Sequence, residues 1–116
     1  MPRSPKSAQA AGTKFERDVA DYLNANWDDH IDRRVKTGAK DKGDIANFRT
    51  TGNEKIVAEC KNTSRLALPA WWREVEAEKH NDEADYGVII HKRHGSADPA
   101  KQWVTLPLSE FLKLLK

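Results

Sequence analysis

Residues 56–61 read IVAECK, a stretch that begins as an apolar strand and ends in charge. Successive side chains of a β-strand point to opposite faces of the sheet. Glu59 and Lys61 are therefore expected side by side on one face, whereas Cys60 points to the opposite face. A core strand of this kind carries a carboxylate and an ammonium group to its C-terminal end. That end is the first candidate for a functional site.

Length and composition limit the class of protein. A chain of 116 residues, with 38% hydrophobic and 33% charged residues, predicts one domain with a heavily charged surface. Cys60 is the only cysteine, which excludes an intrachain disulfide and a zinc site of several cysteines. No apolar run has the length of a membrane span, and the first residues lack the apolar core of a secretory signal. We expect a soluble cytoplasmic protein.

The N-terminal part predicts a tail followed by a helix. Residues 1–11 show no periodic apolar pattern and are predicted to be flexible, and residues 12–116 are predicted to form the single domain. Thr13 is a good N-cap for the first helix, and Glu16 follows at the spacing of a capping box. Glu16 also shares an inward stripe with Leu23, because an offset of seven returns to the same helix face.

The remaining chain predicts strands and helices around one sheet. The expected segments are strands at 29–37, 44–50 and 56–61, a helix at 66–85, strands at 86–92 and 102–106, and a helix at 108–116. The order α-β-β-β-α-β-β-α indicates a mixed sheet flanked by helices, in the α/β or α+β range. Gly52 lies in a short turn, so the second and third strands are expected to pair as an antiparallel hairpin.

The hairpin would bring Asp44 close to Glu59, since the two residues lie almost equally far from the Gly52 turn. Two converging carboxylates repel each other unless a positive group lies between them. Mg²⁺ prefers oxygen ligands, and when bound it polarises phosphoryl oxygens and lowers the pKa of water. Lys61 would stabilise the charge that develops. The set predicts phosphodiester hydrolysis rather than proteolysis, because neither a zinc site nor a catalytic triad is evident.

These residues resemble those of the PD-(D/E)XK nuclease superfamily. The motifs GTKFER at 12–17, RRVKTG at 33–38, GDI at 43–45 and ECKN at 59–62 are similar to those of archaeal-type Holliday junction resolvases and related phage nucleases. The resemblance runs from about residue 12 to the C-terminus and implies a restriction-endonuclease-like fold. Two positions depart from the pattern: Gly43 stands where the superfamily name implies proline, and Ala39 stands where such resolvases often carry serine.

The resemblance implies roles for individual residues. Asp44, Glu59 and Lys61 would be catalytic, and the metal ligands would be Glu16, Asp44, Glu59 and the backbone carbonyl of Cys60. The cofactor would be Mg²⁺, with Mn²⁺ as a substitute. Each residue also has an ordinary structural interpretation: Glu16 as a capping-box residue, and Glu59 with Lys61 as a surface ion pair.

Basic side chains crowd the segment before Asp44 and follow the buried strand at 86–92. They predict phosphate contacts beside the site, although runs of charge are commonly solvated surface. The predicted DNA-binding residues are Arg33, Arg34, Lys36, Lys40, Lys42, Lys92 and Arg93. Trp71 and Trp72 could stack on bases, but at least one is expected in the core. The pair His91 and His94 is not expected to bind metal.

The implied activity is that of a Mg²⁺-dependent endodeoxyribonuclease that cuts branched DNA, foremost a Holliday junction resolvase of recombination and repair. If a phage encodes it, it would act in the host cytoplasm. Two symmetric nicks in a junction require two sites, so a homodimer is expected, through the C-terminal helix or the region around Trp71. Two alternatives stay open: a nuclease for flaps, forks or duplex DNA, and a DNA-binding module without catalysis.

Overall fold

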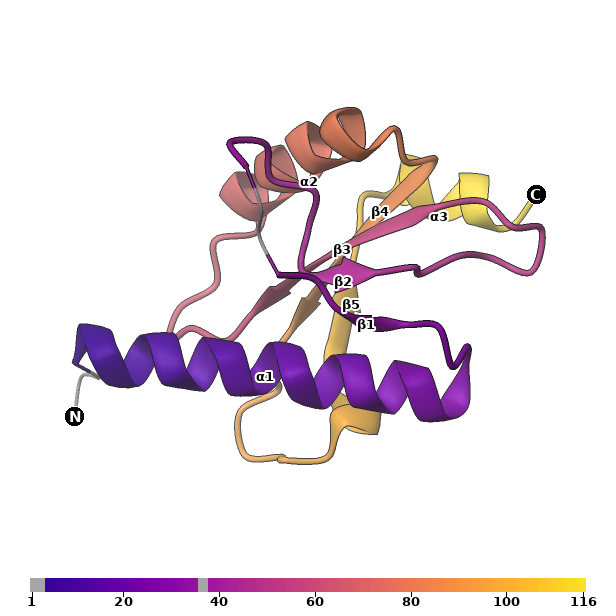
Figure 1. The fold of residues 1–116 in the computed structure, drawn as a ribbon. Helices are drawn as coiled ribbons and strands as arrows, with labels where there is room; N and C mark the ends of the chain where they lie inside the picture. Colours follow the sequence, from indigo (N-terminus) through magenta and orange to yellow (C-terminus); the bar gives the residue numbers. More distant parts are fainter. Residues whose placement is uncertain (1–3, 36–37) are drawn as a thin grey trace.

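The fold has three layers, with a central sheet between α1 and α2 (Figure 1). The computed structural model describes residues 4–35 and 38–116. Its elements are α1 Pro5–Asn26, β1 Asp32–Arg33, β2 Ile45–Ala46, β3 Ile56–Lys61, α2 Leu68–Asp82, β4 Tyr86–His91, a short 3₁₀ helix η1 Pro99–Lys101, β5 Trp103–Thr105 and α3 Leu108–Leu114. This mixed α+β architecture and the predicted order of helices and strands are confirmed, and η1 is the one addition within the described residues.

The main sheet is mixed. β3 and β4 run parallel, with Glu59 opposite Ile89 and Lys61 opposite His91, and β5 pairs antiparallel with β4. Parallel neighbours need a crossover connection, and α2 provides it between β3 and β4. β4 is buried along its whole length, as its near-continuous apolar sequence predicts. β1 and β2 form a separate antiparallel pair.

The predicted hairpin between the second and third strand segments is present. The backbone N–H of Asp44 donates to the carbonyl of Ala58 at 3.0 Å, and that of Ile56 donates to the carbonyl of Phe48 at 2.9 Å. Strand β2 is shorter than expected, because Asn47 adopts a left-handed backbone conformation with φ 63° and interrupts it. The hairpin nevertheless fixes the register between Asp44 and β3.

The predicted start of the first helix is wrong. α1 begins at Pro5, and its N-cap is Ser4, whose hydroxyl oxygen accepts a hydrogen bond from the N–H of Ser7 at 3.1 Å. Proline suits the first turn because its missing N–H would be unpaired there. Thr13 therefore lies inside the helix, and Glu16 is not a capping-box residue. The described part of the expected tail, residues 4–11, is the N-cap and first turns of α1.

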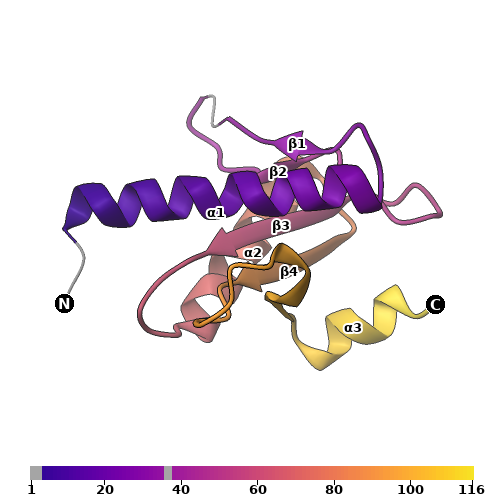
Figure 2. The same cartoon turned by 90° about the horizontal axis from the view of Figure 1, so that it is seen from below.

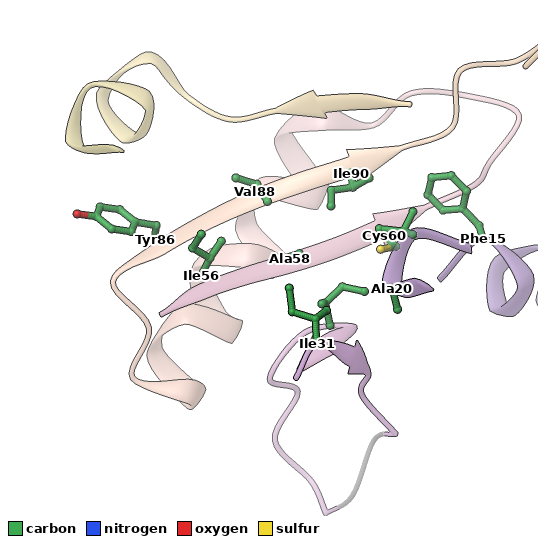
Figure 3. Close-up of a cluster of buried hydrophobic side chains, with 11 residues drawn as sticks. Phe15, Ala20, Ile31, Ile56, Ala58, Cys60, Tyr86, Val88 and Ile90 are labelled. Carbon is green, nitrogen blue, oxygen red and sulfur yellow. The ribbon is translucent and has the colours of Figure 1, made fainter. Parts of the chain in front are cut away.

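Two hydrophobic clusters hold the layers together, one on each face of β3. Phe15, Ala20 and Cys60 belong to the cluster beneath α1 (Figure 3). Val57 and Val75 belong to the cluster beneath α2. Figure 2 shows α1 running across the sheet with α2 behind it. The expected alternation of β3 is therefore confirmed, and each face of the strand is covered by a different helix.

Gly87 allows α2 to pack closely on β4. A Cβ atom on Gly87 would lie 2.4 Å from Val75 Cγ1 and 3.0 Å from Lys79 Cδ, which is closer than van der Waals contact allows. The absent side chain thus sets the distance between α2 and the sheet. It also sets how far the other side chains of α2 reach toward β3.

The C-terminal helix α3 exposes most of its apolar side. Leu108, Phe111, Leu112 and Leu115 are all exposed. The inward side chain is Glu110, which accepts hydrogen bonds from the Gly87 N–H at 2.8 Å and from Lys79 Nζ at 2.7 Å. None of the helices in residues 4–35 and 38–116 combines the length and apolar character needed to cross a membrane.

Candidate active site

Strand β3 presents Glu59 and Lys61 toward α2, as the sequence alternation predicts. Lys61 Nζ lies 4.0 Å from Glu59 Oε2, and it lies 2.7 Å from Glu74 Oε2 on α2. Glu59 is 5% exposed, so Glu59 and Lys61 do not form an ordinary surface ion pair. Burial lowers the pKa of Lys61, but the Glu74 and Glu59 carboxylates outweigh burial and raise it overall. Lys61 is therefore a positioned cation.

Asp44 is held at the edge of β3 by two backbone contacts. Its own N–H donates to the Ala58 carbonyl at 3.0 Å, and its Oδ2 accepts from the Cys60 N–H at 2.7 Å. The preceding Gly43 has a φ of 91°, and a Cβ there would lie 3.2 Å from the Ala58 carbonyl oxygen. Proline cannot adopt this φ, which accounts for glycine at the position where the superfamily name implies proline.

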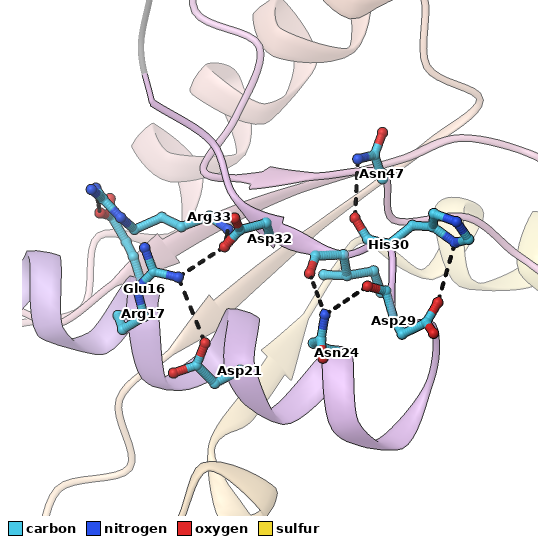
Figure 4. Close-up of polar contacts among 10 residues, drawn as sticks. Glu16, Arg17, Asp21, Asn24, Asp29, His30, Asp32, Arg33 and Asn47 are labelled. Carbon is cyan, nitrogen blue, oxygen red and sulfur yellow. Dashed lines mark hydrogen bonds and ion pairs between the residues drawn. The ribbon is translucent and has the colours of Figure 1, made fainter.

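Glu16 reaches the same point from α1. It lies close enough to Asp44 for the charge of Asp44 to raise its pKa, and its Oε2 lies 3.5 Å from Arg33 Nη1. Figure 4 shows Glu16 beside Arg33, and the neighbouring Arg17 bound to Asp32 at 2.8 Å. The structure thus places Glu16 of α1 near Asp44, which precedes β2, and Asp44 near Glu59 of β3, although the three residues are far apart in sequence.

The carboxyl groups of this cluster have raised pKa values. For Glu16, burial and the Asp44 charge raise the pKa to about 7 against the opposing effect of Arg33. For Asp44, burial and the neighbouring Glu59 raise it to about 8, although the Cys60 N–H favours the ionised form. Burial likewise raises the pKa of Glu59. These carboxyl groups therefore hold protons near neutral pH unless a cation takes their place.

Three acidic residues near the site were not predicted from the sequence. Glu74 binds Lys61, and one carboxylate oxygen each of Glu78 and Asp41 lies within 4.8 Å of a Glu59 oxygen. For Glu78 a signal existed. It follows Trp71 and Val75 at intervals of seven and three residues, so it falls on the inward stripe of α2.

Comparison with known proteins identifies the family. A family profile described as "Phage putative PDDEXK endonuclease" matches residues 7–115. The chain belongs to this phage PDDEXK endonuclease family. The match covers α1 from residue 7 onward, all of α2 and α3 and all five strands, and it includes Glu16, Asp44, Glu59 and Lys61. No curated protein and no solved structure is significantly similar to this chain.

The basic residues that were predicted to contact DNA have different environments in the structure. Arg34 Nη2 binds Asp82 Oδ2 at 3.3 Å, Lys92 Nζ donates to the carbonyl of Ser96, and the guanidinium of Arg93 lies 4.8 Å from the centre of the Trp103 ring. Lys40 and Lys42 are exposed. Lys36 lies outside the described residues. Phosphate contact by these side chains stays a prediction.

Trp71, His91 and His94 each have a packing or hydrogen-bond partner within the chain. Trp71 is 6% exposed and lies against His91, with 5.9 Å between ring centres, so it is core and not a free stacking surface. His91 Nε2 is 2.7 Å from the Thr105 hydroxyl, and His94 Nε2 is 2.8 Å from the Thr63 carbonyl. Among the described residues, no metal-binding group includes His91 or His94.

Proposed function

We propose that this chain is a Mg²⁺-dependent endodeoxyribonuclease that cuts branched DNA in the manner of a Holliday junction resolvase. The observation that carries the proposal is that Asp44 lies near both Glu16 and Glu59, and that Glu59 lies 4.0 Å from the ammonium group of Lys61. One buried and two half-buried carboxylates next to one ammonium group suit a divalent cation and a phosphodiester substrate. Membership in the phage PDDEXK endonuclease family supports the nuclease class.

The donor set fits Mg²⁺, which prefers hard oxygen ligands and keeps several waters. Glu16, Asp44 and Glu59 would hold the cation through their carboxylates, and Cys60 through its backbone carbonyl. The Cys60 thiol takes no part, because it is buried in the core beneath α1. When bound, such a cation supplies Lewis-acid polarisation of a phosphate oxygen and a water of lowered pKa. Mn²⁺ has the same ligand preferences and should substitute.

The protein side chains would do the positioning. Glu74 keeps Lys61 charged and holds its ammonium group at the C-terminal end of β3, where it would stabilise negative charge on the phosphate in the transition state. The Cys60 N–H fixes the orientation of Asp44 from the start, so less reorganisation is needed when DNA binds.

DNA would approach along the basic side of α1. A groove of about 590 Å³ lies next to the Glu16 turn and includes Lys6, Lys14, Arg17 and Arg33 in its lining. Its cationic side chains suit a phosphate backbone, and the exposed Lys40 and Lys42 would extend the contact. Binding through these contacts should weaken steeply with salt.

A homodimer would place two sites on the two strands that a junction resolvase must nick. The exposed apolar side of α3 is the candidate interface. Trp71 is excluded as a direct interface residue because it is buried within the chain. Recombination and repair of DNA in the host cytoplasm are the processes that such an enzyme would serve.

The alternative within the nuclease class is a substrate other than a junction, such as a flap, a fork or simple duplex. The alanine at position 39 favours this alternative, because related resolvases often carry serine there. A binding module without catalysis is the second alternative. The intact carboxylate cluster and Lys61 speak against it.

The deciding experiment compares cleavage of a synthetic four-way junction with cleavage of a matched linear duplex, each with and without Mg²⁺. We expect paired nicks in the junction, no cleavage without metal, and loss of cleavage in Lys61→Ala. Equal cleavage of the duplex would replace junction selectivity with general nuclease activity. An inert wild-type protein that still binds DNA would support the binding module instead.

A further inference from the structure

A second group of carboxylates meets on the α2 side of Glu59. One oxygen each from Asp41, Glu59 and Glu78 lies within 4.8 Å of the other two. The three residues come from the loop before β2, from β3 and from α2. Three separate elements therefore bring negative charge to one point. Two of the three residues, Asp41 and Glu78, are not among the predicted metal ligands of the nuclease site.

Glu78 lacks the partners that a buried carboxylate normally has. It is 1% exposed, and neither of its carboxylate oxygens receives a hydrogen bond from a donor in residues 4–35 or 38–116. Burying a charge or an unpaired polar group is costly, and buried carboxylates are therefore usually hydrogen-bonded, paired or bound to metal. The side chain points toward Glu59 and Asp41, which are two further carboxylates. A positive group between the three would offset their mutual repulsion.

The basic side chains around α2 do not supply that group. Lys61 Nζ is bound to Glu74 at 2.7 Å, and Lys79 Nζ is bound to Glu110 at 2.7 Å. The guanidinium of Arg34 lies 3.3 Å from Asp82. Each of these cations is held by another carboxylate, and within the described part of the chain no ion pair involves Glu78.

The geometry points to a second divalent-cation site formed by Asp41, Glu59 and Glu78, with Glu59 shared between it and the proposed nuclease site. An all-carboxylate set selects hard cations such as Mg²⁺, Mn²⁺ or Ca²⁺ over softer metals. This second site rests on the proposed function in one respect, namely that Glu59 is also a metal ligand of the nuclease site. Cation binding at Glu78 itself can be measured without any DNA.

Hydrogen bonds hold Asp41 in place, as expected for a metal ligand. Asp41 accepts a hydrogen bond from the Gly43 N–H at 2.9 Å, which fixes its carboxylate. The Asp41 carbonyl accepts a hydrogen bond from Asn81 Nδ2 at 2.8 Å, which ties the loop to α2 close to Glu78. Hydrogen bonds that orient a ligand typically contribute to metal affinity.

A competing explanation needs no metal. Glu59 and Glu78 could share one proton as a carboxyl–carboxylate pair, which would satisfy two of the buried oxygens. The two explanations differ for Glu78→Gln. A glutamine amide can donate to Glu59 in place of the shared proton, but it removes the negative charge that a cation requires.

The test counts bound Mn²⁺ on the full chain without DNA, from the loss of the free Mn²⁺ signal in electron paramagnetic resonance. We expect two Mn²⁺ per chain for the wild type and one for Glu78→Gln. Asp41→Asn, on a half-buried loop position, should weaken one of the two sites by at least roughly tenfold. Glu76→Gln, at an exposed position of the same helix, is the matched control and should bind two. Circular dichroism reports whether each variant is folded.

Two outcomes overturn the inference: a wild type that binds a single Mn²⁺ which a folded Glu78→Gln retains, or a folded Glu78→Gln that binds two with unchanged affinity. If Glu78→Gln does not fold, Asp41→Asn decides, because unchanged affinity there also overturns the site. A Glu78-dependent Mn²⁺ in a protein that cleaves no DNA would refute the proposed nuclease function and leave the cation site standing. If the protein cleaves DNA and binds a single Mn²⁺ that Glu78→Gln retains, the nuclease function stands and the second cation site is refuted.

Discussion

The carboxylate of Asp44 accepts a hydrogen bond from the backbone N–H of Cys60 at 2.7 Å. This contact joins the entry of β2 to the C-terminal end of β3. It holds Asp44 next to Glu59 although burial and Glu59 raise the pKa of Asp44 to about 8. The fold therefore maintains a cluster of carboxyl groups that is unfavourable when fully ionised. This property has measurable consequences for stability and metal binding.

The metal-free protein should lose stability as the pH rises from about 5 to about 8. The folded-state pKa values of Glu16 (about 7) and Asp44 (about 8) lie above the ordinary values of 4.5 and 3.8. The folded state thus binds more protons than the unfolded state in this window, and its advantage is lost as these carboxyl groups ionise. Thermal unfolding in a chelator at a series of pH values measures the effect.

Mg²⁺ or Mn²⁺ should reverse this trend, because a cation replaces the displaced protons. The apparent metal affinity should accordingly increase with pH over the same range. Asp44→Asn removes one of the titrating groups and should flatten the stability profile. A melting temperature of the metal-free wild type that rises between pH 5 and 8 would contradict the raised pKa values.

Asp44→Asn should separate catalysis from folding. The asparagine side-chain oxygen can still accept the Cys60 N–H, and asparagine removes the cost of burying Asp44 above its ordinary pKa, so the metal-free variant at pH 7 should be at least as stable as the wild type. The lost negative charge should reduce DNA cleavage by at least roughly a hundredfold, since even supporting residues of metal sites contribute that much. Asp29→Asn, at an exposed position, should change neither quantity. Full cleavage by Asp44→Asn would remove Asp44 from the site.

The sequence predicts those parts of the site whose positions are set by a single helix, strand or hairpin. Strand alternation places Glu59 and Lys61, and the count across the Gly52 turn brings Asp44 to the correct end of β3. Glu16 is placed on the inward face of its helix by periodicity alone, and the structure brings it to Asp44. These placements depend on backbone geometry within one element or one hairpin.

The parts that the sequence did not predict depend on packing between distant elements. The contact of Glu74 with Lys61 requires the distance between α2 and β3, which no local pattern contains. The sequence did not single out Glu78 as a site residue because the surrounding turn of the helix is rich in charged residues. Its spacing from Trp71 nevertheless places it on the inward face. The N-terminal extension of α1 was missed because residues before Thr13 carry no apolar period, even though Ser4 and Pro5 are a helix-start signal.

Glu74→Gln should lower the pKa of Lys61. The Glu74 carboxylate raises this pKa against the effect of burial, so its removal leaves burial less opposed. The alkaline limb of the cleavage–pH profile should then move to lower pH if the Lys61 ammonium group acts in the transition state. Glu76→Gln is the matched control on the same helix. An unshifted alkaline limb would indicate that Lys61 protonation does not limit cleavage.

Gly87→Ala should destabilise the fold. Its Cβ would lie 2.4 Å from Val75 Cγ1, so α2 must move or Val75 must leave its rotamer, at a cost of about 1–3 kcal/mol. Gly12→Ala is the opposite control: Gly12 lies within α1 with nothing within 4 Å of the new methyl group, and a gain of about 0.5–1 kcal/mol is expected. Urea unfolding midpoints measure both. Equal stability of Gly87→Ala and wild type would show that α2 is not held at this distance.

The proposed dimer makes a prediction for α3. Leu112 is 50% exposed and lies beside the exposed Phe111 and Leu115, so a glutamate at position 112 would put a charge into any interface on this side of the helix. Sedimentation velocity should show a dimer for the wild type and a monomer for Leu112→Glu. Leu66→Glu introduces the same charge at an apolar residue that is 67% exposed outside α3, and it should remain dimeric. A wild-type monomer at all concentrations would remove the paired-site geometry from the proposal, because one chain then supplies one nick at a time.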